Sequence, residues 1–117
     1  MPNPYSRYIK IGEELKSIVA NIFIGQINIP EAGLLTITKV IVSTDLKIAN
    51  IYISFLGNKK RIDELLKIIN SKNKFIRYHV AKKIKLKYIP ELHFYYDDTM
   101  KHAEKIDRLI NKIHHDD

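Results

Sequence analysis

Two neighbouring runs of β-branched residues constrain the fold of this chain more than any other feature. They cover residues 34–43 and 47–56, and only Thr44, Asp45 and Leu46 lie between them. Because so short a connection leaves no room for a crossover, the two strands are predicted to pair antiparallel as a hairpin. The odd-numbered residues of the second run are apolar. We therefore expect that side to face the core and the other side to stay partly wet.

Helical periodicity flanks the hairpin on both sides. Apolar residues recur every three or four positions over residues 5–24, which predicts a first helix. Shorter apolar stripes predict two further helices over 59–70 and 74–84, separated by a polar break of about four residues. Asn58 is expected to cap the first of this pair.

A third strand and a last helix complete the pattern. Alternating Leu92, Phe94 and Tyr96 follow Pro90 and predict a strand, and Asp98 is expected to cap a helix after it. The order is therefore αββααβ plus a C-terminal helix. We predict a single α+β domain over residues 1–117, with a three-stranded sheet and its helices packed on one face.

Composition excludes several classes of protein. The chain has no cysteine, so it has neither a disulfide scaffold nor a thiol nucleophile, and no apolar run approaches the ~18 residues of a membrane span. We expect a cytoplasmic protein without a metal or cofactor. Glu91 and Asp97 are six residues apart on one strand, which places them ~20 Å apart and argues against a shared metal ion. We therefore expect no catalysis.

Positive charge is concentrated in one segment. Residues 59–87 contain eleven basic and two acidic residues, a net +9, whereas the whole chain carries +7. Such a surface attracts polyanions, nucleic acid first and anionic lipid second, although a solvated basic face remains an alternative.

One helix face gathers cations around a tyrosine. At 100° per residue, residues 74–85 place Lys74, Arg77, Tyr78, Lys82 and Lys85 within roughly 140° of one another. Such a face suits phosphate contacts and base stacking, although an ordinary polar face is the alternative. The full set predicted to bind RNA is Arg7, Lys10, Lys72, Asn73, Lys74, Arg77, Tyr78, Lys82, Lys85 and Lys87.

Other polar and aromatic residues are expected to be structural. Ser43 and Asp45 are predicted to fix the hairpin turn, because Asp in turns accepts backbone N–H groups. The tyrosines near the third strand, Tyr88, Tyr95 and Tyr96, are expected at the rim of the core.

The αββααβ order with a broken helix pair is the arrangement of a type II KH domain. Local motifs narrow this to a resemblance to the ribosome-binding factor A family. The matching stretches are Val40-Ile-Val-Ser43-Thr-Asp45-Leu46-Lys-Ile-Ala49 running into Tyr52, Ile89-Pro90-Glu91-Leu92-His-Phe94-Tyr-Tyr-Asp97-Asp98, Phe75-Ile76-Arg77 and Arg7-x-x-Lys10-Ile11-Gly12. The resemblance covers roughly residues 5–113.

One departure concerns the helix break. The family typically has Ala-x-Gly there, whereas this chain has Ser71-Lys72-Asn73. Asn tolerates a left-handed backbone better than other non-glycine residues, so a kink at Asn73 is compatible with the sequence, which does not decide whether the family's kink is kept. Its side chain limits how closely an RNA backbone can approach.

The resemblance implies a non-catalytic ribosome-assembly factor with a KH domain. It would bind the immature small (30S) subunit and 16S rRNA and support late maturation, including 5′ end processing of precursor rRNA. A monomer assisted by an assembly GTPase, and important in the cold, would fit the family. The alternatives are a generic KH-like RNA-binding protein outside ribosome assembly, a small metal-dependent nuclease and, least favoured, a membrane-surface protein.

Overall fold

A computed structural model describes residues 4–99, with side chains from residue 7 onward. The elements in order are α1 (Pro4–Gly25), the 3-10 turn η1 (Pro30–Ala32), β1 (Leu34–Val42), β2 (Ile48–Leu56), α2 (Ile62–Ser71), α3 (Asn73–Lys83) and β3 (Glu91–Tyr96). This confirms the predicted α+β class and the αββααβ order. Beyond Thr99 the last predicted helix lies outside the described residues, and so do the N–H groups that Asp98 was expected to cap.

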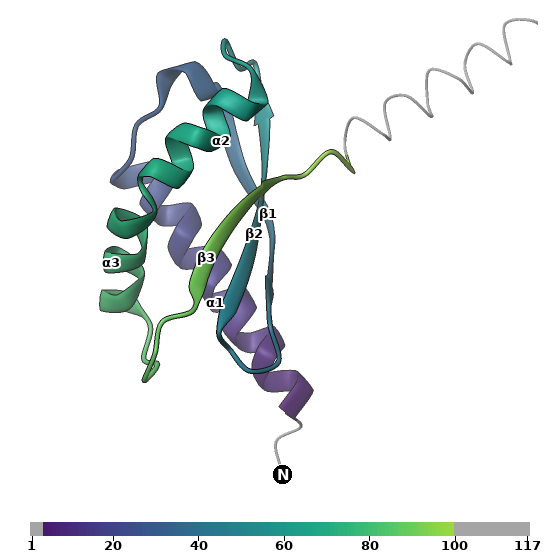
Figure 1. Cartoon of the computed structure of the whole chain (residues 1–117), viewed down its shortest axis with the longest axis vertical. Helices are drawn as coiled ribbons and strands as arrows, with labels where there is room; N and C mark the ends of the chain where they lie inside the picture. The colour runs from purple at the N-terminus through teal and green to yellow at the C-terminus, as the bar shows by residue number, and fades with distance from the viewer. Residues whose placement is uncertain (1–3, 100–117) are drawn as a thin grey trace, which may run out of the picture.

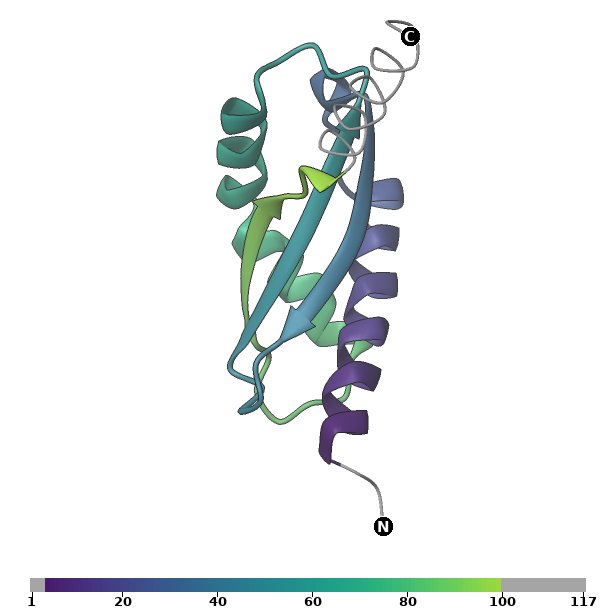
Figure 2. The same ribbon diagram turned by 90° about the vertical axis from the view of Figure 1, so that its right-hand side faces the viewer.

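The three strands form one sheet in the order β1-β2-β3. β1 and β2 pair antiparallel as the predicted hairpin, whereas β3 joins the other side of β2 in parallel. Figure 1 shows α1, α2 and α3 on one side of this sheet, and Figure 2 shows its opposite face turned toward the viewer with the helices behind it. The helices therefore cover one face, as the sequence predicted.

The central strand β2 supplies the middle of the core. Ala49, Ile51 and Ile53 are fully buried against the helices, as their odd-numbered spacing predicted, and Phe55 is half-buried. α1 lies close against the same face. A Cβ at Gly12 would lie 3.1 Å from the Val40 carbonyl oxygen, so glycine permits this close approach of helix to strand.

β1 contains a bulge that its sequence did not reveal. The register passes from Ile37 opposite Ile53 to Lys39 opposite Tyr52, which leaves Thr38 as the extra residue. The bulge shifts the alternation by one position. Leu35 and Ile37 before it, and Val40 and Val42 after it, therefore all pack against the core.

The bulged Thr38 makes a long-range contact with the end of β3. Its hydroxyl donates to Asp97 Oδ2 at 2.6 Å, and Asp97 Oδ1 accepts the Thr99 N–H at 3.0 Å. The Thr38 hydrogen bond, followed by those from the Thr99 hydroxyl and N–H, lowers the pKa of Asp97 from 3.8 to about 2. This carboxylate therefore joins the two edge strands of the sheet.

The segment before α2 differs from the prediction. α2 begins at Ile62, and Arg61 occupies its N-cap position without a side-chain cap hydrogen bond. The predicted cap Asn58 was wrong: its amide donates to the Lys60 carbonyl oxygen at 2.8 Å and stabilises the loop. A capping residue must directly precede its helix, and α2 begins at Ile62, the first residue of its apolar stripe, rather than at residue 59.

Thr38→Val tests the contact with Asp97. Loss of the hydroxyl donor should raise the pKa of Asp97 toward 3.8 and lower the free energy of unfolding at neutral pH by about 1 kcal/mol or less, since the pair is partly solvated. The pKa of Asp97 in the folded state lies below its ordinary value. The contribution of the Thr38–Asp97 hydrogen bond to the free energy of unfolding is therefore present above pH 3.8 and lost as the pH falls through about 2. At that pH the free energies of unfolding of Thr38→Val and of the parent should converge.

Thr36→Val, an exposed threonine of the same strand, is the matched control and should leave the pH dependence unchanged. An NMR titration of Asp97 with urea unfolding at several pH values measures both effects. An unshifted Asp97 pKa in Thr38→Val would contradict this account.

Gly33 provides a test of the start of β1. It has φ +65°, and a Cβ there would collide with the Leu56 carbonyl and the Gly57 backbone. Gly33→Ala should therefore lower the free energy of unfolding by about 2 kcal/mol, whereas Gly25→Ala, which meets no atom within 4 Å, should be close to neutral. Thermal unfolding measures both. Equal stability of the two variants would contradict the positive-φ requirement.

Candidate nucleic-acid interface

The break between α2 and α3 consists of one residue. Lys72 ends α2 and precedes α3 with φ −96° and ψ 9°, and Asn73 is already the first residue of α3. Leu46 is the one non-glycine residue within 4–99 with positive φ. The chain therefore keeps a break at this point without a left-handed residue at Asn73, because the turn at Lys72 suffices to redirect it.

The Asn73 side chain ties the break to the sheet. Its Nδ2 donates to the Leu92 carbonyl oxygen at 2.8 Å. The N–H groups of Glu91 and Asp97 bond to β2, so the alternate residue Leu92 presents its carbonyl on the outer edge of β3. Asn73 thus supplies a partner to an edge carbonyl and holds the start of α3 against β3.

Arg77 makes a similar contact one turn later. Its Nη2 donates to the Ile89 carbonyl oxygen at 2.9 Å, in the loop before β3. Asn73 and Arg77 are four residues apart, so they lie on the same side of α3. Both were predicted to bind RNA, and the structure gives each a contact that positions α3.

The exposed face of α3 contains the other predicted residues of this helix. Lys74, Tyr78 and Lys82 are exposed, and the Lys82 ammonium lies 4.4 Å from the centre of the Tyr78 ring. Lys85 is not on this face. α3 ends at Lys83 and Ile84 is extended, so the extrapolation of helical angles to Lys85 was wrong.

A cleft lies at one end of the molecule, where three segments far apart in sequence converge. Figures 1 and 2 show the start of α1, the β1–β2 turn and the α3–β3 loop side by side at the lower end. The cleft there has a volume of about 430 Å³. We call it the basic cleft. Its lining residues are Arg7, Asp45, Leu46, Lys47, Arg77, Leu86, Lys87, Tyr88, Ile89 and Glu91.

The two acidic residues of the basic cleft have partners of their own. Asp45 Oδ1 accepts the Ser43 hydroxyl at 2.7 Å and the Lys47 N–H at 3.1 Å. The Ser43 hydrogen bond, then that of Lys47, lowers the pKa of Asp45. Glu91 lies 3.7 Å from His93 Nε2. Ser43 and Asp45 thus fix the turn that carries Lys47.

The structure separates the predicted residues into groups. Arg7, Arg77 and Lys87 meet at the basic cleft, whereas Lys10 and Lys72 do not line it. Lys47 and Tyr88 were missed as site residues. Tyr88 was expected at the rim of the core, but it is 76% exposed. In the sequence, only its position next to Lys87 in a basic segment indicated that Tyr88 could belong to a binding site.

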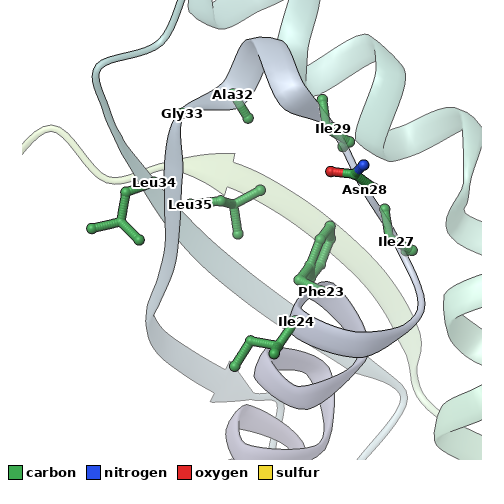
Figure 3. Close-up of a pocket in the computed structure, with 9 residues that line it drawn as sticks. All are labelled: Phe23, Ile24, Ile27, Asn28, Ile29, Ala32, Gly33, Leu34 and Leu35. Atoms are coloured by element: carbon green, nitrogen blue, oxygen red, sulfur yellow. The ribbon is translucent and has the colours of Figure 1, made fainter.

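A second pocket is chemically different. It has a volume of about 200 Å³ and lies between the end of α1 and the start of β1. Figure 3 shows Phe23 and Leu35 facing each other across it, with Asn28 as its one polar side chain among the residues drawn. Because no charged group lines this pocket, it does not suit a phosphate ligand.

Neither a metal site nor a membrane span emerges from the part of the chain that the structure describes. Within residues 4–99, no three His, Asp or Glu side chains gather closely enough to hold a metal ion. None of the helices in that range is long and apolar enough to cross a bilayer.

Comparisons with known proteins agree with this fold. Residues 7–110 match the family model described as ribosome-binding factor A. The chain is 34% identical over 108 residues to ribosome-binding factor A of Staphylococcus epidermidis, covering 92% of this chain and 93% of that protein.

A crystal structure and a fitted homology model of ribosome-binding factor A from Thermus thermophilus have the same fold. The crystal structure gives a TM-score of 0.69 at 18% identity, covering 76% of this chain and 93% of the other. The homology model of that factor, as fitted into the cryo-EM map of a 30S complex, gives 0.64 at 19% identity, covering 74% and 90%.

The fold and basic surface are those of a small α+β binding protein. The family match and the identity over most of the chain define the family: this chain belongs to the ribosome-binding factor A family.

Asn73→Ala tests whether the amide positions α3. Loss of the bond to Leu92 should lower the free energy of unfolding by about 1 kcal/mol. Asn70→Ala, an exposed asparagine at the end of α2, is the matched control, since both changes alter helix propensity similarly. Urea unfolding measures the difference. Equal stability of the two variants would show that the Asn73–Leu92 bond does not anchor α3.

Proposed function

We propose that this protein is a non-catalytic assembly factor that binds the immature small ribosomal subunit through 16S rRNA. It supports late maturation of the particle, including 5′ end processing of the precursor rRNA, and leaves before translation begins. The observation that carries this proposal is a cationic surface that no ion pair within residues 4–99 involves, in a chain of the ribosome-binding factor A family. A homology model of a member of that family, from Thermus thermophilus, has been fitted into the cryo-EM map of a 30S complex.

The availability of the cations supports RNA binding. The two ion pairs within residues 4–99 are Arg61–Asp63 and His93–Glu91, and neither includes a cation of α3 or of the basic cleft. These charges therefore remain available to phosphates, which supply most of the affinity in protein–nucleic acid complexes.

The carboxylates support a role without catalysis. Glu91 and Asp97 lie at opposite ends of β3, the first beside His93 and the second bonded to Thr38 and Thr99. Each therefore has its own partner, and the two do not converge on a shared site. A nuclease would place such groups around one metal ion.

Binding can act on the RNA without breaking a bond. A surface that contacts phosphates better in one rRNA arrangement than in another shifts the population toward the first. Both α3 and the basic cleft suit this role. A surface can bind two RNA arrangements with different affinities only when its charges are held in fixed positions. Such a bias matters most in the cold, where misfolded RNA rearranges slowly.

The cellular setting follows from the same proposal. We infer a cytoplasmic protein that forms a single KH-like domain and acts as a monomer without a cofactor, with an assembly GTPase assisting its release. Ribosome assembly supplies the compartment and the large RNA partner that this surface requires.

Co-sedimentation with ribosomal particles tests the proposal. We expect the purified protein to pellet with immature small subunits in preference to mature subunits and naked RNA. If about six phosphates are neutralised, the log–log salt slope should be near −5. Equal binding to every RNA offered would replace the assembly role with that of a generic KH-like RNA-binding protein.

A pair of double variants locates the surface that binds. Lys74→Ala with Lys82→Ala should flatten the salt slope by about two. The control double variant, Lys59→Ala with Lys60→Ala, removes the same charge from the loop before α2. In Figure 1 this loop lies at the end of the molecule opposite the α3–β3 loop, and the control should change the salt slope less. If the two double variants have equal salt slopes, α3 contributes no more to RNA binding than the loop before α2 does, and it is not the binding surface.

A further inference from the structure

We propose that the basic cleft binds one unstacked nucleotide of single-stranded RNA, with Tyr88 stacking on the base and Arg7, Lys47 and Lys87 around the phosphate. This inference deepens the proposed function and rests on it for the source of the RNA. The cleft itself is defined by side chains from three distant segments.

The dimensions of the basic cleft suit a small ligand. Its volume of about 430 Å³ falls within the ~300–1,000 Å³ typical of small-molecule sites. Leu46, Leu86 and Ile89 supply apolar lining and are half-buried, packing against the core of the protein. An apolar wall with cations around it matches a nucleotide, which has a flat base and a charged phosphate.

Tyr88 provides a stacking surface. The ring is 76% exposed, and its one ring contact within the described residues is the Lys87 ammonium, 5.5 Å from the ring centre. A tyrosine that is this exposed contributes little to the core. A base stacked on an aromatic ring in a cationic groove is the usual arrangement in single-strand binding, and it tolerates any sequence.

The cations of the cleft are arranged for a phosphate. Arg7 comes from α1, Lys47 from the hairpin turn and Lys87 from the α3–β3 loop, and no ion pair within residues 4–99 involves them. Two carboxylates also line the cleft. Asp45 accepts the Ser43 hydroxyl and the Lys47 N–H and also lies in the field of the Lys47 charge, whereas Glu91 lies beside His93. An anion entering the cleft therefore meets four basic and two acidic residues, an excess of positive charge.

Two contacts hold the walls of the cleft in place. The Arg77 hydrogen bond to Ile89 fixes the loop that carries Tyr88. Leu46 has φ +62°, an uncommon conformation for a non-glycine residue, and the Leu46 N–H bonds to the Ser43 carbonyl at 2.9 Å. Residues held in such conformations are enriched at ligand sites, where the surroundings over-determine them.

The occupant is a single-stranded segment because the stacking faces of the internal bases of a helix are not accessible. In duplex RNA both faces of each internal base are covered by neighbours, so Tyr88 cannot stack along the length of a duplex. A duplex can still contact the exposed lysines of α3. The cleft therefore distinguishes unpaired from paired RNA, whereas α3 does not.

Binding of a labelled single-stranded RNA hexanucleotide to the full chain tests this inference. Tyr88→Ala should weaken binding about fivefold or more, and Tyr88→Phe, which keeps the ring, less than about twofold. Tyr95→Ala is the matched control, because Tyr95 is also exposed (44%) but lies on β3 away from the cleft. It should change affinity less than about twofold, and all three variants should bind a blunt RNA duplex like the parent.

Each contrary result overturns the inference. If Tyr88→Ala weakens hexanucleotide binding no more than Tyr95→Ala does, Tyr88 does not stack on a base. If Tyr88→Ala loses as much affinity for duplex RNA as for the hexanucleotide, the cleft binds RNA by charge alone. An acidic peptide of equal charge that competes as well as the hexanucleotide would identify the cleft as a general anion site. NMR shifts of the Leu46 and Lys87 amides upon hexanucleotide addition locate the ligand, and their absence would also overturn it.

Failure of this inference differs from failure of the proposed function. If Tyr88→Ala leaves hexanucleotide binding intact while the parent still selects immature subunits, the cleft assignment fails and the assembly role stands. If the parent binds all particles equally but Tyr88 still determines hexanucleotide affinity, the assembly role fails and the cleft assignment stands.

Discussion

Burial of Ile76 and Val80 in the core decides how α3, and with it the second half of this fold, is arranged. The hydrogen bond from the Asn73 amide to the Leu92 carbonyl joins the helix break to the outer edge of β3, which would otherwise present an unpaired backbone group. Arg77 extends the same attachment to Ile89 one turn later. The buried side chains and these two contacts set the same rotation of α3 about its axis, so Lys74 and Tyr78 face outward.

Local patterns predicted the elements well because hydrophobic alternation is a property of neighbouring residues. The odd-numbered residues of β2 illustrate this, since Ala49, Ile51 and Ile53 are all buried. The bulge at Thr38 was beyond such reasoning. It is stabilised by Asp97, 59 residues away, and local patterns do not reveal the strand order that brings β1 and the end of β3 together.

The candidate site was less predictable for a related reason. Helical angles correctly grouped Lys74, Tyr78 and Lys82, but they could not show that Arg77, about 60° from Lys74, turns toward the loop before β3. Helical angles also do not indicate that α3 ends before Lys85. The basic cleft joins residues about 40 positions apart, such as Arg7 and Lys47, and only the tertiary structure reveals that proximity.

The absence of glycine at the helix break has a consequence for how RNA can be held. Without a side chain, glycine would allow an RNA backbone to approach the main chain closely, whereas Asn73 occupies that position and directs its amide to β3. In the function proposed above, contacts with RNA come from side chains that reach outward. The exposed Lys74 and Lys82 are the candidates along α3, and Lys47 and Lys87 are the candidates at the cleft. Asn73 thus limits the close approach of an RNA backbone and also anchors the helix that presents Lys74 and Lys82. Anchoring by Asn73 and the proposed RNA contacts by the lysines therefore belong to different residues of one helix.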